Sequence, residues 1–513
     1  MFWNSGERDL IKGLDILGLR TQDQSVEAPL VSSITTISIR ARYLSLLPWV
    51  VGEVFRDSSH KYSEKDVQRL MQIIDRLELL IILSTQHLRA QNSTLITTGM
   101  IGDLVYKEYI DAFNDRKELN AKILAESSKK KGYLSRSYAT YLNPCRGFGM
   151  FSNTNATPFA LPPRGQEAYQ ARAAHIPRDS LTLSWLLNGG KMTAGMLDDE
   201  AMLFSVGNIA SIPDELECLR RSFLLPYNDE DSFVVERYRK FQGTIKWALT
   251  NLGKGNSAAQ LIESNYQRCV ESKYEDLTET EFLWFEYDLR RKVHYALEII
   301  LGVFSDTLAD INGGIVEDVI REWDTLSGLS ETISRIYGVQ SVSFDKTIED
   351  VISKLSSVSA NESVGSLVPA EKCLYALALI IRTYMNTNNK VSALTNQTNR
   401  IDYLRVVFEI LDRSRKSSIF SVCTNIIKQC VVVPHLNTAL RKMSQGNQCS
   451  LRFYPEGQTL TPTGTATGPG MSATRLTNTM NMLADIELCD RTPNGFQPNN
   501  ETGKVIERLG SIP

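Results

Sequence analysis

The stretch SSITTISIRARYLSLLPWVVGEVF, residues 32–55, is apolar enough to form a buried helix, yet it carries Arg40 and Arg42 near its middle. In a helix that starts at Ser33, these two side chains point about 200° apart, so both cannot face solvent if most of the helix is buried. At least one guanidinium is therefore expected inside the protein or at an interface, where it needs acidic partners. The acids closest in sequence are the candidate partners: Asp15, Glu53 and Asp57.

The residues around the two arginines favour a structural role for this stretch. They are typical of a protein core: Ile39, Tyr43, Leu46, Leu47 and Trp49. A phosphate group is another partner for a buried guanidinium, but ion pairing with a carboxylate fits apolar surroundings better. We predict that Arg40, Arg42 and Trp49 are structural or interface residues.

The composition is that of a folded, soluble protein. The chain has 513 residues, of which 42% are hydrophobic and 22% are charged, so roughly two to four domains are expected. The net charge of −3 means that nucleic acid or an anionic membrane must be met by a local basic patch. No run of about 18 uncharged apolar residues and no signal peptide is present. Eight dispersed cysteines indicate reduced thiols, and we predict a cytoplasmic protein without membrane contact.

Helical periodicity dominates the chain. Residues 63–89, 102–127 and 278–311 repeat apolar side chains every three or four positions, and Ser63 with Asp66 predicts a capped helix start. These patterns predict a mainly α, multi-domain chain with a C-terminal winged-helix-like α+β module. The expected segments are a helical N-terminal domain with the RARY…PW helix (1–125), a basic aromatic loop with an acidic helical segment (126–232), a helical middle domain (233–358), a helical connector (359–434) and the winged-helix-like module (435–513).

A basic segment and an acidic segment follow each other in the first half of the chain. KKKGYLSRSYATYLNPCRGFGMF, residues 129–151, interleaves five cations with aromatic rings, a combination that binds phosphates and stacks on bases. The predicted nucleic-acid contacts here are Lys129, Lys130, Lys131, Arg136, Tyr138 and Arg146. The alternative is a solvated loop whose aromatic rings dock on the core. Residues 198–231 hold nine acids against two arginines, which indicates internal charge pairing or a surface for a different partner.

The order helix, hairpin, helix within residues 435–513 resembles a winged helix. We expect a helix over 472–488, with Leu476, Met480 and Leu483 on its core face, and a hairpin that turns at Asn494-Gly495. The predicted solvent-facing contacts to DNA are Thr474, Arg475, Asn478 and Asn481 on the helix and Arg491 at the foot of the wing. Seven Lys/Arg against six Asp/Glu in 435–513 is a weak footprint for DNA, so protein docking is the alternative.

No enzyme motif was found. The chain lacks a phosphate-binding P-loop and a G-x-S-x-G elbow, and its five histidines are scattered, so we predict no catalytic residue, cofactor or metal ion. Arg290 and His294 share a helix face, as in HEPN-type ribonucleases, but their spacing is at least one residue too short. A metal-dependent nuclease or toxin built from acids of separate helices remains an alternative, and its candidate residues are Glu281, Glu286 and Asp288.

Arg40-Ala41-Arg42-Tyr43 with Pro48-Trp49 resembles an uncharacterised bacterial family that is encoded in antiphage defence islands beside helicases and nucleases. PFALPPRGQEAYQA (158–171) and the segment 189–223 are similar to its following segments, although Val31-Ser32-Ser33 replaces the usual Pro-Gly turn. Taken with the basic segment and the winged-helix-like module, the resemblance leads us to expect a non-catalytic subunit that binds nucleic acid, with DNA as the expected partner, and that docks a helicase or nuclease in bacterial immunity. The alternative is an adaptor that binds protein alone.

Overall fold

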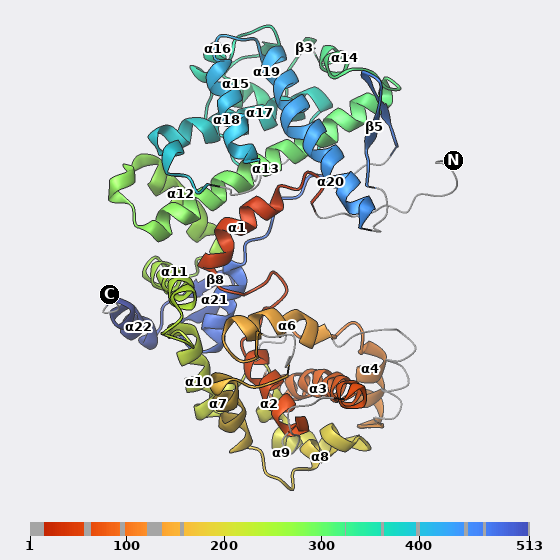
Figure 1. Cartoon of the computed structure of the whole chain (residues 1–513), viewed down its shortest axis with the longest axis vertical. Coiled ribbons are helices and arrows are strands. Elements are labelled where there is room, and N and C mark those ends of the chain that lie inside the picture. Colours follow the sequence, from red (N-terminus) through yellow and green to blue (C-terminus); the bar gives the residue numbers. More distant parts are fainter. Residues whose placement is uncertain are drawn as a thin grey trace. The chain divides into compact units, whose positions relative to one another are not determined.

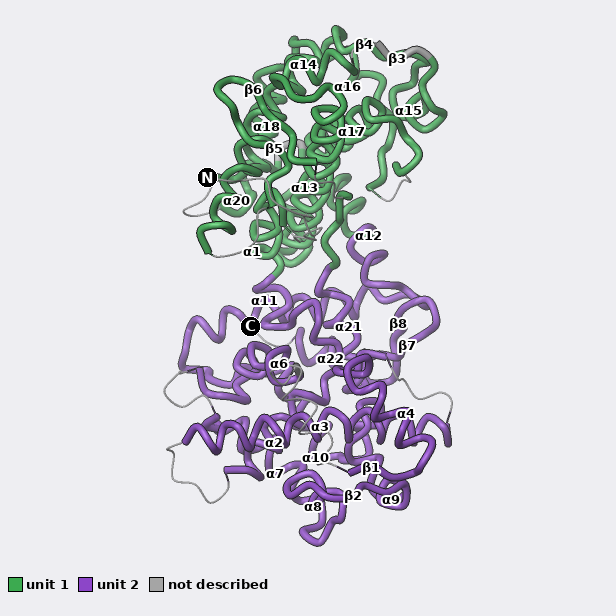
Figure 2. Tube along the Cα trace, turned by 90° about the vertical axis from the view of Figure 1, so that its right-hand side faces the viewer, with its two compact units in different colours: residues 1–27, 264–473 green, residues 28–263, 474–513 purple. Residues whose placement is uncertain are grey.

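The structure, a computed structural model, describes most of the chain in ten ranges. They are residues 15–55, 63–92, 98–120, 136–153, 159–323, 325–360, 364–396, 401–445, 450–464 and 468–510. The described chain is mainly helical, as predicted, with small two-stranded antiparallel sheets (Figure 1). It divides into two compact units, each built from two separate parts of the sequence (Figure 2). Unit 1 comprises residues 1–27 and 264–473, and unit 2 comprises residues 28–263 and 474–513.

Unit 2 contains the N-terminal helices and the last two helices of the chain. The first of its helices are α2 (Tyr43–Phe55), α3 (Glu64–Gln91), α4 (Lys107–Arg116), α6 (Arg136–Gly147), α7 (Pro163–Ala173) and α8 (Leu181–Asn188). They are followed by α9 (Ala194–Phe204), the 3₁₀ turn η1 (Ile209–Ser211), α10 (Pro213–Leu224), α11 (Ser232–Thr250), α21 (Leu476–Asp485) and α22 (Asn500–Gly510). Its sheets pair β1 (Glu118–Asn120) with β2 (Lys191–Thr193), and β7 (Asp490–Thr492) with β8 (Gly495–Gln497). The main packing partners are α2 with α7 and α3 with α9.

Unit 1 is built around the longest helix, α13 (Glu279–Asp310), which packs along α17 (Pro369–Thr387). Around this pair lie α14 (Val316–Arg321), α15 (Glu331–Tyr337), α16 (Ile348–Ile352), α18 (Tyr403–Arg413), α19 (Ile419–Ile426) and α20 (Val433–Ser444). Short 3₁₀ or π turns are η2 (Tyr274–Asp276), η3 (Asn388–Ala393) and η4 (Ile427–Val432). The sheets pair β3 (Thr325–Ser327) with β4 (Ser341–Ser343), and β5 (Phe453–Glu456) with β6 (Thr459–Pro462). The boundaries between the units fall within α1 (Arg20–Leu30) and α12 (Ala258–Glu271) and after Ala473.

Two long helices form where the sequence predicts them, because their starts are specified locally. Ser63 and Asp66 make a reciprocal capping box before α3, and Thr278 and Glu281 make one before α13. Each box satisfies backbone N–H groups that a helix leaves without partners in its first turn. The prediction for 102–127 is only partly right, since α4 ends at Arg116, Lys117 is left-handed, and β1 follows.

The opening stretch does not form a helix from Ser33. In the structure α2 begins at Tyr43, after both arginines. The residues before it form turns in which the hydroxyl of Ser38 accepts from the Thr35 N–H at 2.8 Å and the hydroxyl of Thr35 accepts from the Ser38 N–H at 3.1 Å. Hydroxyl groups that bond the local backbone compete with helix formation. The expectation that Arg40 and Arg42 lie on one helix was therefore wrong.

The C-terminal segment 435–513 contains the predicted elements, but they are shared between the units. Helix α20 and the β5–β6 hairpin belong to unit 1, whereas α21, β7, β8 and α22 belong to unit 2. The hairpin near Asn494-Gly495 is confirmed, and Leu476, Met480 and Leu483 are fully buried, as expected for the core face of α21. The helix itself starts at Leu476 and not at 472.

One described helical stretch, Ile419–Ser444, is long and apolar enough to cross a membrane by length and composition. It joins α19, η4 and α20, and its most apolar window has a mean hydropathy of 1.4. In unit 1, 56% of that window is buried inside the protein. A buried core helix of a soluble protein passes the same test, so the stretch is weak evidence for a membrane span.

Candidate functional site

Arg40 is buried in unit 2, and its partner comes from the far end of the chain. One guanidinium nitrogen lies 3.1 Å from Asp485 Oδ1 on α21 and donates to the Val206 carbonyl at 3.0 Å. The backbone takes part as well, because the Arg40 N–H donates to the Tyr141 hydroxyl at 2.8 Å and the Ala41 N–H donates to Asp485 Oδ2 at 2.9 Å. Through these contacts, residues 40–41 bind α21 to the N-terminal part of unit 2.

Arg42 is also buried, and its partner is a different carboxylate. Its Nη2 lies 3.0 Å from Glu215 Oε2 on α10, and its Nε donates to Glu215 Oε1 at 3.3 Å. Its remaining nitrogen donates to three backbone carbonyl groups: Met202, Ser205 and Asn208. Every polar atom of this guanidinium therefore has a partner, as a buried charge requires. Two of the three candidate partners bond elsewhere, because Asp15 accepts from the Arg20 N–H and Glu53 pairs with Arg178 at 2.7 Å. The third candidate, Asp57, lies outside the described residues.

Glu215 binds a second arginine. Arg172 Nη1 on α7 lies 2.6 Å from Glu215 Oε1, and the Ser45 hydroxyl donates to the same carboxylate. Burial lowers the pKa of Arg172 to about 10, although Glu215 opposes that shift. Burial also works against ionised Glu215, but Arg172 and Arg42 outweigh it and hold the pKa of Glu215 below its usual value. The Arg172 guanidinium lies 5.3 Å from the ring centroid of buried Trp49.

The basic aromatic segment is described only in part. Lys129, Lys130 and Lys131 and the side chain of Arg136 lie outside the described residues. Tyr138 packs its ring against Phe151 and Phe159, with centroids 6.2 and 5.7 Å away. Arg146 donates to the Ser152 carbonyl at 3.2 Å. For the described members, these contacts match the alternative in which the aromatic rings dock on the core.

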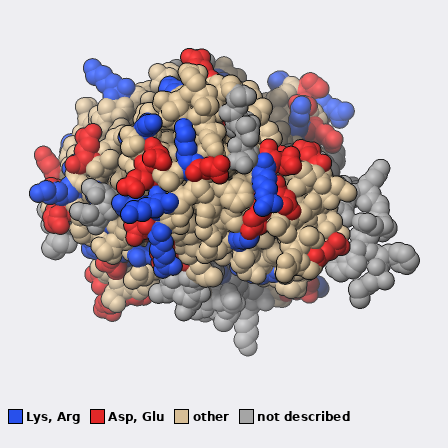
Figure 3. Space-filling view, turned by 90° about the horizontal axis from the view of Figure 1, so that it is seen from above, with Lys and Arg blue, Asp and Glu red and all other residues tan. Residues whose placement is uncertain are grey.

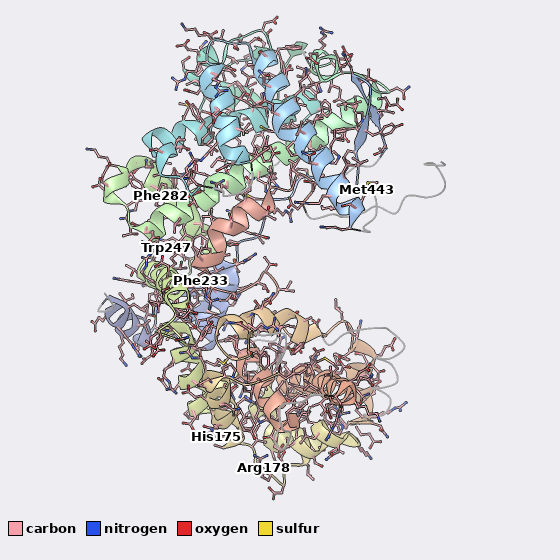
Figure 4. All side chains as sticks on the ribbon, in the orientation of Figure 1. His175, Arg178, Phe233, Trp247, Phe282 and Met443 are labelled. Atoms are coloured by element: carbon pink, nitrogen blue, oxygen red, sulfur yellow. The ribbon has the colours of Figure 1, made fainter. Side chains whose placement is uncertain are left out.

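Three arginines that follow the basic segment in sequence also bond within unit 2. Arg164 donates to the carbonyl groups of Leu225 and Pro226, both at 3.0 Å. Arg172 holds Glu215, and Arg178 holds Glu53 (Figure 4 labels Arg178). Figure 3 shows one face of the molecule, on which basic and acidic side chains are interspersed.

The predicted DNA contacts of the C-terminal module are drawn into the fold. Asn478 is 7% exposed and donates to the Thr35 carbonyl at 2.8 Å, and Thr474 is 8% exposed. The expectation that these two side chains face solvent was wrong, because Thr474 is buried just before α21 and Asn478 on α21 bonds the segment before α2. Arg491 bonds Asn481 and lies 2.6 Å from Asp485 Oδ1, while Arg475 is half-buried.

The predicted wing is paired with another part of unit 2. Strand β8 exchanges backbone hydrogen bonds with the loop before α12. The Asn256 N–H donates to the Phe496 carbonyl at 3.1 Å, and the Phe496 N–H donates to the Asn256 carbonyl at 2.9 Å. At Phe496, the backbone edge of β8 is therefore already paired with Asn256.

The three acids proposed for a nuclease site lie on or near α13 and have separate cationic partners. Arg268 Nη1 lies 2.5 Å from Glu281, Arg290 lies 2.8 Å from Glu286, and Lys292 lies 2.8 Å from Asp288. Burial works against ionised Asp288, but the neighbouring Lys292 and Arg291 lower its pKa. Among the described residues, no cluster of three or more His, Cys, Asp or Glu side chains has metal-binding geometry.

His294 lies between two carboxylates in unit 1. Its ring nitrogens are 2.9 Å from Asp23 Oδ2 on α1 and 3.1 Å from Glu298 Oε1 on α13. Burial lowers the pKa of His294, but the hydrogen bonds to Asp23 and Glu298 outweigh it and raise the pKa to about 10. Glu298 also accepts from the Gly470 N–H at 2.8 Å. The Arg290–His294 pair therefore belongs to a buried ionic network.

Just after the acidic segment, residues 198–231, lies an exposed aromatic side chain that the sequence analysis did not predict as a site. Phe233, in the first turn of α11, is 75% exposed (labelled in Figure 4). Asp231 caps this helix and accepts from the N–H groups of Phe233 at 2.9 Å and Val234 at 3.3 Å. The side chains of Asp229 and Glu230 are exposed beside it and have no partner among the described residues. An aromatic residue inside an acidic helix cap is the sequence signal that marks this surface.

The chain was compared with protein families, curated proteins and solved structures. No protein-family model matches it, and neither a curated protein nor a solved structure matches it. The resemblance to the defence-island family stays a prediction from the sequence.

Proposed function

We propose that this chain is a non-catalytic docking subunit of a multi-component bacterial antiphage system and that its main partner is a protein. The antiphage setting rests on the RARY…PW resemblance alone. The choice of a protein partner is supported by the contacts above, because the described residues first assigned to nucleic acid mostly bond within the fold. Arg146, Asn478 and Arg491 are examples.

The observation that carries the proposal is the surface formed by Asp229, Glu230, Phe233 and Val235, here called the acidic–aromatic surface. Phe233 is 75% exposed and Val235 is 38% exposed. Exposed aromatic side chains are enriched among the residues that dominate binding energy at interfaces. The cap made by Asp231 orders the backbone that carries the ring, which reduces the backbone entropy lost on binding.

The chemistry of this surface specifies the kind of partner that fits it. The ring needs an apolar socket, and the two free carboxylates favour a rim of Lys or Arg around that socket. Charges at the rim mainly accelerate association, whereas the buried ring governs dissociation. We therefore expect association that slows as the salt concentration rises, and we expect the largest loss of affinity when the ring is removed.

The test is co-purification of the tagged full chain with the products of the genes next to its own. Phe233→Ala should weaken capture of one such product by roughly 30-fold, the effect of losing a binding hot spot of about 2 kcal/mol. The double variant Asp229→Lys/Glu230→Lys should weaken it at low salt. Leu181→Ala removes another exposed side chain of unit 2, 67% exposed, and should leave capture unchanged. Equal capture by all variants, or capture of none of these products, contradicts the proposal.

Nucleic-acid binding is the second candidate, and the sequence of residues 129–136 supports it. Fluorescence anisotropy with labelled duplex and single-stranded DNA over a salt series tests it. A variant with Lys129, Lys130, Lys131 and Arg136 changed to Ala should bind more weakly and with a shallower dependence on salt, because each lost phosphate contact lowers the slope by roughly one unit. Flat titrations for both proteins leave protein docking as the function.

A further inference from the structure

Unit 1 contains a cavity of about 240 Å³ that none of the functions above uses. Its walls come from the segment that leads into α1, the segment that leads into α18, and one face of α20. The lining residues are Leu17, Gly18, Gln22, Ile401, Tyr403, Pro434, Asn437, Thr438 and Arg441. All of them belong to unit 1, so the cavity lies within one compact body.

Three polar side chains on α20 line this cavity, and they share one face of the helix. Asn437 and Thr438 lie four and three positions before Arg441, so each of them is a neighbour of Arg441 on the helix surface. None of the three side chains has a hydrogen-bond or ionic partner within the described ranges. Thr438 is only 6% exposed. A guanidinium, a hydroxyl group and an amide that converge without partners are the groups that bind a small anion.

Gly18 keeps the space in front of these side chains open. Its φ is +73°, a conformation that favours glycine. A Cβ atom at this position would lie 2.5 Å from the Thr438 hydroxyl oxygen and 3.7 Å from Arg441 Nη2. Any other residue at position 18 would therefore be strained and would also fill the cavity next to the two donors.

The charges around the cavity favour an anion. Arg441 is exposed at its edge, and Arg20 and Lys442 lie close enough to influence one another. Burial lowers the pKa of Lys442, and the positive charges of Arg441 and Arg20 add to this shift, while Asp15 opposes it. Lys442 is held in place by a 2.7 Å hydrogen bond to the Asp15 carbonyl.

The remaining walls are apolar. Leu17 and Pro434 are buried, Tyr403 is half-buried, and Ile401 is 59% exposed at the mouth. A volume of about 240 Å³ is below the range of roughly 300–1,000 Å³ that is common for drug-sized ligands. The ligand is therefore smaller than a dinucleotide or a drug-sized compound.

We propose that this cavity binds a small molecule with a phosphate or carboxylate head and a short apolar or aromatic tail. Arg441 holds the head by its charge, and Thr438 and Asn437 donate hydrogen bonds to it. The tail packs between Leu17, Tyr403 and Pro434. This site is independent of protein docking, and either proposal can fail without the other.

Titration calorimetry of the full chain with phenyl phosphate tests the proposal. Inorganic phosphate and phenol test the head and the tail separately, and benzoate distinguishes a carboxylate ligand from a phosphate ligand. We expect saturable binding of phenyl phosphate or benzoate that is at least tenfold tighter than that of inorganic phosphate or phenol. Arg441→Gln should weaken it at least tenfold, and Thr438→Val should weaken it less. Arg413→Gln removes an exposed arginine of the same unit outside the cavity and should have no effect.

A second variant covers the case in which Thr438→Val disturbs the buried side of α20. Asn437→Asp changes an exposed side chain and places a negative charge beside the head, so it should abolish binding without changing the melting temperature. The proposal is overturned if neither phenyl phosphate nor benzoate binds saturably. It is also overturned if Arg441→Gln and Asn437→Asp bind as tightly as the unchanged chain.

Discussion

At the scale of single residues, the charges buried in unit 2 are balanced by partners from distant parts of the sequence. Arg42 and Arg172 share Glu215, so the buried group carries one more positive charge than negative. Backbone carbonyl groups that accept from Arg42 compensate for that excess, and they come from the last turn of α9 and from the segment between α9 and α10. Because burying charged groups is expensive, such a network stabilises one packing of the helices over others only while it is complete.

Removing one member of this network should destabilise unit 2 strongly. Arg42→Met leaves Glu215 buried with a single arginine and leaves three carbonyl groups without a donor. We expect a loss of about 3–5 kcal/mol in the free energy of unfolding of unit 2, measured by urea denaturation. Arg239→Met breaks an exposed pair with Glu236 in the same unit and should cost less than about 1 kcal/mol. Similar losses for both variants would mean that burial is not the cause.

His294 should make unit 1 less stable at alkaline pH. Its pKa in the folded protein is about 10, above the ordinary value of 6.5, so the folded state holds a proton that the unfolded state releases between these values. The stabilisation is fully present below pH 6.5 and is lost as pH rises through 10. His294→Gln should flatten the decline in melting temperature between pH 7 and 10. A decline of unchanged slope in the variant would assign it to other groups.

His435 should act in the opposite direction. It is fully buried, and its Nε2 accepts from the Arg452 N–H at 3.0 Å. Burial lowers its pKa to about 4, so the unfolded state takes up a proton first as pH falls. Its stabilisation is present above pH 6.5 and declines toward pH 4, by at most about 3 kcal/mol. His435→Gln should flatten the acid side of the stability profile and leave the alkaline side unchanged, which makes the two histidine variants controls for each other.

At the scale of the elements, those with local signals could be predicted and those fixed by distant contacts could not. Helices α3 and α13 follow from their capping residues and apolar periodicity. The start of α2 was placed ten residues too early. The hydroxyl groups of Thr35 and Ser38 bond the local backbone, and Arg40 and Arg42 are held by Asp485 and Glu215, which are far away in sequence. The buried state of Asn478 was missed for the same reason, since its partner is the Thr35 carbonyl.

The β7–β8 hairpin offers a test of such a distant contact. A Cβ atom at Gly495 would overlap the backbone of Asn256 and Ser257, where β8 pairs with the loop before α12. Gly495→Ala should therefore separate the two segments and destabilise unit 2 by about 1–3 kcal/mol. Gly503→Ala is the matched control, because nothing lies within 4 Å of its Cβ position in α22, and it should stabilise the helix by about 0.5–1 kcal/mol. Thermal unfolding followed by circular dichroism measures both.

At the scale of the whole molecule, each unit is completed by a segment from elsewhere in the chain. Residues 1–27 join 264–473, and residues 474–513 join 28–263. Local periodicity does not show that a unit is built from two separate parts of the sequence. The sequence alone therefore predicts that residues 435–513 form one module. The contact between Arg40 and Asp485 joins α21 to the rest of unit 2, whereas α20 and the β5–β6 hairpin of the predicted module belong to unit 1.

Hydrogen–deuterium exchange of the full chain can decide between one C-terminal module and two shared segments. Arg42→Met weakens unit 2 without touching unit 1. If the division into units governs stability, exchange should accelerate in α21 and α22 together with α2 and α10, while α13, α17 and α20 keep their protection. A winged helix that folds as one cooperative body requires α20, the β5–β6 hairpin, α21 and α22 to lose protection by the same factor. If α20 and α21 lose protection together, residues 435–513 form one module. If α21 loses protection while α20 keeps it, the last forty residues belong to unit 2 and depend on its arginine network.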